Sequence, residues 1–174
     1  MDAMLMRAFQ SQVLLQCRFL LQAAKDINEA LKKPDTTLIF YGLQNLLTAG
    51  ANISKALWGQ GGKLEVERKP LRDSIGVGDD SPLREVTMRN NFEHFDERLD
   101  RWNKESKRHN IGDILIGDKA GFSGLEDIEK FRHFDPKTTN IIFWSQEFNL
   151  QNLVNEAQEL LPKLEAEAKK PHWE

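Results

Sequence analysis

The chain has 174 residues, of which 40% are hydrophobic and 29% charged, and its formal net charge is −3. These values exclude a disordered chain and a nucleic-acid-binding surface that is basic all over, and they predict a single domain over residues 1–174. No apolar run approaches the roughly 20 residues of a membrane span, so we expect no membrane partner.

The cysteine and histidine residues limit which disulfides and metal sites the chain can form. Cys17 is the single cysteine, which excludes an intrachain disulfide and suits a small buried thiol in a reducing cytoplasm. The first ten residues do not resemble a signal peptide, so we expect a cytoplasmic location. The four histidines lie on different predicted elements without a close pair of ligands, so neither a metal site nor a cofactor is predicted.

Two long helices are predicted over residues 4–33 and 36–58, because apolar residues recur at steps of three and four. Pro34 is expected to end the first helix, and Asp35 or Thr36 to cap the second. The short turn between them predicts an antiparallel helical hairpin. Small residues in the second helix favour close packing over a functional role: Gly42, Ala49, Gly50 and Ala51.

A long connection follows over residues 59–80, rich in glycine and basic residues. Gly59-Gln60-Gly61-Gly62 lacks the Lys-Ser/Thr pair that would complete a Walker motif. A short strand over residues 63–68 is one interpretation of the alternating apolar side chains. The connection is either a solvated loop or a basic flap over the next helix, because connections of this length tend to be functional or disordered.

A third helix is predicted over residues 81–107. Its apolar stripe consists of Met88, Phe92, Phe95, Leu99 and Trp102. At about 100° per residue, Arg89 and His94 point about 140° apart on one continuous helix. They would therefore converge only on a ligand that lies across both, or around a second copy of the same helix.

The last third of the chain predicts mixed structure. We expect a strand over residues 111–116, a hairpin over residues 131–144 and a final helix that begins at Asn149 as its cap. Pro162 should kink this helix or end it early. The tail, residues 165–174, is expected to be frayed.

The segment Arg89-Asn90-x-x-x-His94 resembles the conserved motif of the HEPN superfamily, in which an Arg and a His stand a few residues apart on a helix. Many of these small helical domains are metal-independent ribonucleases of toxin–antitoxin and phage-defence systems, and the residue after their Arg is usually polar, as Asn90 is. One toxin branch carries Tyr where this chain has Asp96, so the modification chemistry of that branch is not carried over. The resemblance, together with the predicted elements, implies an α+β, mainly α fold: a HEPN-like up-down helical bundle with a small C-terminal β-hairpin and a final helix.

The resemblance implies a metal-independent endoribonuclease of toxin or defence type that cleaves RNA by 2′-hydroxyl attack. Paired His94 side chains of a homodimer would move protons, Arg89 would stabilise the charged phosphate, and Asn90 would orient the imidazole or bind a phosphate oxygen. Basic residues in the second half of the third helix either complement the helix dipole or guide RNA: Arg98, Arg101, Lys104, Lys107 and Arg108.

A second hypothesis comes from another functional class. The chain would be a non-catalytic, HEPN-like module that binds a nucleotide or a protein partner, such as a cognate antitoxin or a nucleotidyltransferase. The mild acidity of the chain favours this alternative, because a protein that works on RNA usually presents a broad basic surface.

Overall fold

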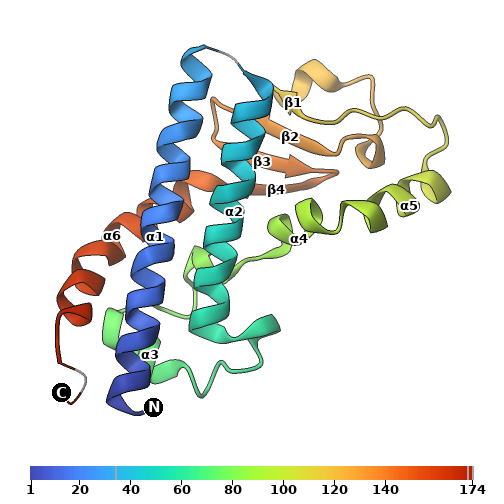
Figure 1. Ribbon diagram of the computed structural model, residues 1–174. Coiled ribbons are helices and arrows are strands. Elements are labelled where there is room, and N and C mark those ends of the chain that lie inside the picture. The colour runs from blue at the N-terminus through green and yellow to red at the C-terminus, as the bar shows by residue number, and fades with distance from the viewer. Residues whose placement is uncertain (34, 172, 174) are drawn as a thin grey trace.

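The computed structural model describes residues 1–33, 35–171 and 173. Helices α1 (Ala3–Lys32) and α2 (Thr36–Trp58) form an antiparallel hairpin, and α6 (Leu150–Ala168) packs along α1 (Figure 1). A four-stranded sheet lies near the end of the hairpin at which α1 leads into α2 (Figure 1). The prediction of a mainly helical α+β fold is confirmed.

The two long helices begin and end within a residue of the predicted bounds. The Asp35 side chain caps α2 by accepting a hydrogen bond from the backbone N–H of Leu38 at 3.1 Å. Pro34, which was expected to end the first helix, lies outside the described residues. The interpretation of Gly42 as a site of close packing is confirmed, since a Cβ there would lie 2.6 Å from Cγ1 of Ile27 on α1.

The prediction of one continuous third helix over residues 81–107 is wrong. The segment forms a 3₁₀ turn, η2 (Pro82–Arg84), and two short helices, α4 (Thr87–Glu93) and α5 (Phe95–Glu105). Nor does this segment complete a bundle beside α1 and α2, because α6 takes that place (Figure 1). Helices α4 and α5 instead extend away from α2 along the sheet.

The helix breaks at His94 because its two halves bury apolar side chains against different neighbours. Phe92 on α4 packs on Phe143, with ring centroids 6.5 Å apart, whereas Phe95 on α5 packs on Phe131 at 5.4 Å. His94 between them has φ −93° and ψ 43°, outside the helical region. The apolar stripe continues across the break, so its periodicity carries no sign of it.

The connection 59–80 is folded. It contains a 3₁₀ turn, η1 (Gln60–Gly62), and a helix, α3 (Lys69–Ile75), and residues 63–68 form turns rather than a strand. The Arg72 side chain is buried and donates hydrogen bonds to the backbone carbonyls of Leu57 and Glu65, both at 2.8 Å. The connection is therefore folded rather than a floppy loop, and none of its basic side chains lies over α4 in the cavity that α4 helps to line.

The sheet contains the predicted hairpin and one further strand on each side of it. Strands β2 (Arg132–Asp135) and β3 (Asn140–Phe143) pair antiparallel, as expected, and β1 (Leu115–Ile116) adds to β2 in parallel, within the predicted strand 111–116. Strand β4 (Gln146–Asn149) pairs antiparallel with β3 and was not predicted. Two further 3₁₀ turns lie between β1 and β2: η3 (Lys119–Phe122) and η4 (Asp127–Glu129).

Helix α6 begins as predicted, because the Asn149 side chain accepts a hydrogen bond from the N–H of Asn152 at 3.1 Å. The helix runs through Pro162 to Ala168, so the expected early end does not occur. The segment 165–174, predicted to be frayed, starts inside the helix, and His172 and Glu174 lie outside the described residues. No helix in the described part of the chain has the length and apolarity needed to span a bilayer.

Candidate functional site

The sequence motif lines a cavity of about 560 Å³. One wall comes from the last turn of α2 and from the glycine segment 59–62 that follows it. The opposite wall comes from η2, α4 and the start of α5. The polar and charged side chains of this second wall are those of Arg84, Arg89, Asn90, His94 and Arg98.

The helix break brings the motif residues to one cavity within a single chain. On a continuous helix, Arg89 and His94 would point about 140° apart, and the sequence therefore predicted that they would converge only on a ligand that lies across both, or around a second copy of the helix. Because the chain turns at His94, both residues line the same cavity, together with Asn90. The premise of one continuous helix is therefore wrong, and of the two alternatives a ligand that lies across Arg89 and His94 needs no second chain.

Two backbone hydrogen bonds hold His94 at the corner of the cavity. Its N–H donates to the carbonyl of Asn90 at 2.9 Å, and its carbonyl accepts from the N–H of Arg98 at 3.2 Å. The imidazole is about half exposed, and its Nδ1 lies 3.6 Å from a carboxylate oxygen of Glu97. The ring is therefore accessible to a ligand in the cavity.

Four basic side chains line the cavity, and no carboxylate does. Three of them are paired with glutamates from outside the lining. Arg89 pairs with Glu93, Arg98 with Glu97 at 3.4 Å, and Arg84 with Glu65 at 2.6 Å. Cationic side chains without a lining carboxylate suit an anionic ligand, and the paired glutamates reduce the positive charge around the cavity.

Lys55 is the fourth cation, and it differs from the arginines. It lies in the last turn of α2 and its side chain makes no ion pair with any described residue. A flexible ammonium without a carboxylate partner keeps its full charge for an incoming anion. Sequence reasoning missed Lys55, because a lysine near a helix C-terminus is already explained by the helix dipole.

The glycine segment forms part of the same wall. Gly59, Gly61 and Gly62 have φ values of 78°, 63° and 75°, in the left-handed region that favours glycine. A Cβ at Gly59 would also lie 2.7 Å from Cβ of Leu64. The glycine run is visible in the sequence, where it lacks the rest of a Walker motif. That it lines the same cavity as Arg89 depends on tertiary structure.

The remaining candidate RNA-binding residues lie outside the cavity. Arg101 pairs with Glu105 at 2.8 Å and stacks over Trp144, and Arg108 lies 3.4 Å from Glu126. Lys104 and Lys107 are exposed but do not line the cavity. Of the five basic residues singled out from the sequence, Arg98 alone joins the Arg89–His94 cavity.

No group of three His, Cys, Asp or Glu side chains in residues 1–33, 35–171 and 173 is placed to hold a metal ion.

No protein-family model matches this chain, and neither does any curated protein or solved structure. Its function must therefore be inferred from the chemistry of the cavity itself.

Proposed function

We propose that the chain is a metal-independent endoribonuclease of toxin or defence type, with the Arg89–His94 cavity as its active site. The observation that carries the proposal is the meeting of an accessible imidazole, His94, with four cations around one cavity that no carboxylate lines. Phosphate diesters are anionic, and their cleavage needs proton transfer near neutral pH, which imidazole performs.

Different residues would bind the phosphate and transfer the proton during 2′-hydroxyl attack. Arg89, Arg98 and Lys55 bind the phosphate oxygens and stabilise the negative charge that builds up on the pentacoordinate phosphorus. His94 takes the proton from the 2′-hydroxyl while its oxygen attacks the phosphorus. The bond from phosphorus to the 5′-oxygen breaks, and this oxygen leaves with a proton. The products are a 2′,3′-cyclic phosphate and a 5′-hydroxyl end.

Protonation of the 5′-oxygen requires a second acid. Within the described residues, His94 is the one histidine that lines the cavity. We propose that a homodimer supplies the second acid as His94 of a second copy, across the polar surface of α4 and α5. The two-fold symmetry of a dimer places two equivalent cavities face to face when the interface passes between them.

Membership of the HEPN superfamily remains part of this proposal. It is supported by Arg89, Asn90 and His94, the residues of the resemblance, which line one cavity.

We also propose that the protein works in a reducing cytoplasm, which suits the free thiol of Cys17.

The alternative is a non-catalytic module that binds a nucleotide or a protein partner, such as an antitoxin or a nucleotidyltransferase. The pairing of Arg84, Arg89 and Arg98 with glutamates favours it, because these carboxylates reduce the charge available to a phosphate. A site of this kind binds an anion without needing a second proton-transfer group.

A cleavage assay on mixed RNA in EDTA distinguishes the two functions. We expect cleavage by the wild-type chain and a rate loss on the order of 10²–10⁴ in His94→Ala, as for removal of a general acid or base. Arg89→Lys should recover little of the activity lost in Arg89→Ala, because an ammonium lacks the planar fork of guanidinium. His109→Ala is the matched control, since His109 lies outside the cavity.

Two results would overturn the ribonuclease. One is RNA left intact by the wild-type protein over hours, with binding retained, which would support the binding module. The other is equal cleavage of a DNA oligonucleotide of the same sequence, because DNA lacks the attacking 2′-hydroxyl. Light scattering reports the oligomeric state in parallel, and a monomer that cleaves at full rate would exclude the paired histidines.

A further inference from the structure

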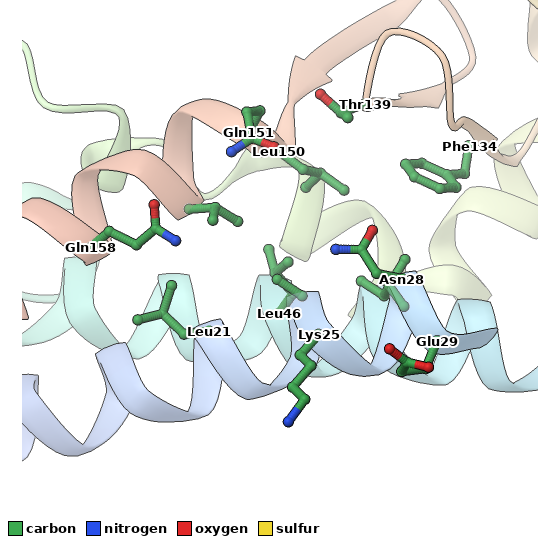
Figure 2. A pocket seen from close by; sticks show the side chains of 13 residues that line it. Leu21, Lys25, Asn28, Glu29, Leu46, Phe134, Thr139, Leu150, Gln151 and Gln158 are labelled. Atoms are coloured by element: carbon green, nitrogen blue, oxygen red, sulfur yellow. The ribbon is translucent and has the colours of Figure 1, made fainter. Parts of the chain in front are cut away.

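A second cavity, of about 430 Å³, lies between α1, α6 and the turn that joins β2 to β3 (Figure 2). It shares no residue with the Arg89–His94 cavity. Its volume is within the range of roughly 300–1,000 Å³ that is typical of small-molecule sites. Leu46 of α2 also lines it, so four segments of the chain build this cavity and it is a product of the tertiary fold.

The floor of this second cavity is apolar. Leu46, Phe134 and Leu150 are buried beneath it, and Leu21 and Val154 are partly exposed at its sides. Apolar surface that stays in contact with water is a source of binding energy for a ligand that covers it. A ligand with flat apolar faces is therefore favoured here.

The rim is polar but uncharged where it faces the cavity. Figure 2 shows the amide groups of Asn28 and Gln158 directed toward each other across the space beside Leu150. Neither amide has a hydrogen-bond partner among residues 1–33, 35–171 and 173. Each amide offers both a donor and an acceptor to a ligand.

The two charged residues of the rim do not supply charge to the cavity. The ammonium group of Lys25 points away from it (Figure 2). The Glu29 carboxylate accepts a hydrogen bond from the Lys32 ammonium at 2.7 Å. An anionic ligand such as a phosphate would therefore gain little from this rim.

One edge of the cavity is fixed before any ligand binds. The Asn149 side chain donates hydrogen bonds to the carbonyl of Thr138 at 2.9 Å and to Oδ1 of Asn140 at 2.8 Å. The N–H of Leu150 donates to the carbonyl of Thr139 at 3.0 Å. These bonds tie the β2–β3 turn to the start of α6, so little ordering is needed on binding.

We propose that this second cavity binds an uncharged aromatic heterocycle of nucleobase size. The ring faces cover the apolar floor, and donors and acceptors on the ring edge pair with the amides of Asn28 and Gln158. Asn and Gln side chains recognise the edge of adenine in this manner elsewhere. The site is independent of the proposed ribonuclease, because it uses none of the residues assigned to cleavage.

The test is a titration of the full chain with adenosine, followed by calorimetry and by amide chemical shifts. We expect saturable binding with the largest shifts at residues 21–29 and 150–158. Adenosine monophosphate should bind no more tightly than adenosine, because the one ammonium group of the rim, that of Lys25, points away from the cavity. Benzene serves as the comparison that has the apolar faces without the hydrogen-bonding edge, and it should bind more weakly.

Two kinds of variant locate the ligand. Gln158→Leu and Asn28→Leu remove one amide each from exposed positions and should weaken adenosine binding about tenfold, the effect of losing one or two good hydrogen bonds. Ala24→Phe, which fills the space with a side chain, should abolish binding. Gln22→Leu is the matched control, because Gln22 lies on α1 outside this cavity and pairs with Asp26.

Absence of saturable binding at millimolar adenosine would overturn the proposal. So would adenosine binding that survives unchanged in both amide variants and in Ala24→Phe, or benzene binding as tight as that of adenosine. His94→Ala should bind adenosine like the wild type. Loss of binding in this variant would instead place the ligand in the Arg89–His94 cavity.

Discussion

Arg98 donates a hydrogen bond from Nε to the side-chain oxygen of Asn91 at 3.0 Å, across the helix break at His94. Asn91 is 4% exposed, and its amide nitrogen donates to Gln146 on β4 at 2.9 Å. One buried amide thus connects α4, α5 and the sheet, and it holds Arg98 on the wall of the Arg89–His94 cavity.

The first prediction follows from this connection. Asn91→Ala removes both hydrogen bonds, and we expect a loss of about 1–3 kcal/mol in the free energy of unfolding, measured by urea denaturation. RNA cleavage should fall as well, because Arg98 loses the contact that orients it. Asn103→Ala is the matched control on the exposed side of α5. Equal stability of the two variants would show that the buried amide holds nothing in place.

The second prediction concerns Lys55. Lys55→Ala should weaken the binding of a 2′-O-methyl RNA oligonucleotide, which binds but cannot be cleaved by 2′-hydroxyl attack. The slope of log affinity against log salt should become smaller by about one, since one phosphate contact is lost. Lys63→Ala removes a nearby exposed lysine outside the cavity and should leave the slope unchanged. Equal slopes for both variants would remove Lys55 from the site.

The third prediction is a dependence of stability on pH through Asp113. Burial tends to raise the pKa of its carboxyl, but hydrogen bonds and the positive charge of Arg132 lower it below its usual range. Because the folded-state pKa is depressed, this pair stabilises the fold above the unfolded pKa of about 3.9. The stabilisation is lost as the pH falls through the folded-state pKa.

Asp113→Asn should therefore lower the Tm at pH 7, by an amount that corresponds to about 1 kcal/mol for a partly buried pair. The difference in Tm between variant and wild type should shrink below pH 4. A difference that stayed constant from pH 7 to pH 3 would contradict the assignment. Circular dichroism melts over this pH range provide the measurement.

The fourth prediction compares two glycines of α2. Gly42→Ala should destabilise the fold by about 1 kcal/mol, because overpacking against Ile27 outweighs the gain in helix propensity. At Gly50 a Cβ would meet the nearest side-chain atom, on Leu153, at an ordinary 3.6 Å. Gly50→Ala should stabilise the fold by about 0.5–1 kcal/mol. Thermal melts of both variants check the opposite signs.

The fifth prediction concerns the single thiol. Burial, with a smaller contribution from the charge of Glu156, raises the pKa of Cys17 to about 12. The thiolate is the reactive form, so iodoacetamide at pH 8 should leave the folded protein unlabelled and should label it in urea. Mass spectrometry counts the label. Labelling of the native protein as fast as that of free cysteine would show that the helix hairpin opens readily at this point.

Local sequence determined where the long helices lie and most of their ends. Apolar periodicity defined both ends of α1 and α2 and the start of α6, though not its end, and the caps Asp35 and Asn149 are where the sequence predicted them. The β2–β3 hairpin was also predictable, because its turn at residues 135–139 separates two apolar runs. In each case the decisive interactions join residues close together in the chain.

Strand β4 was not predicted because the turn before it lacks the usual turn residues. The β3–β4 turn uses Trp144 at a φ of 56°, where a hairpin usually has glycine or asparagine. A bulky aromatic residue in that conformation gives no turn signal. Its cost is offset by packing of the Trp144 ring on Phe143 and Phe131, which only the folded chain provides.

The sequence indicated one wall of the candidate site but not the other. Arg89, Asn90 and His94 were identified from their spacing and from the resemblance to the HEPN motif, but the tertiary structure decided that they line one cavity within one chain. Phe92 packs on Phe143 of β3, whereas Phe95 packs on Phe131 just before β2, and these competing contacts break the helix at His94. The opposite wall, with Lys55 and Gly59–Gly62, lies about 30 residues earlier in the chain. Local periodicity carries no information on such pairings, because long-range packing creates them.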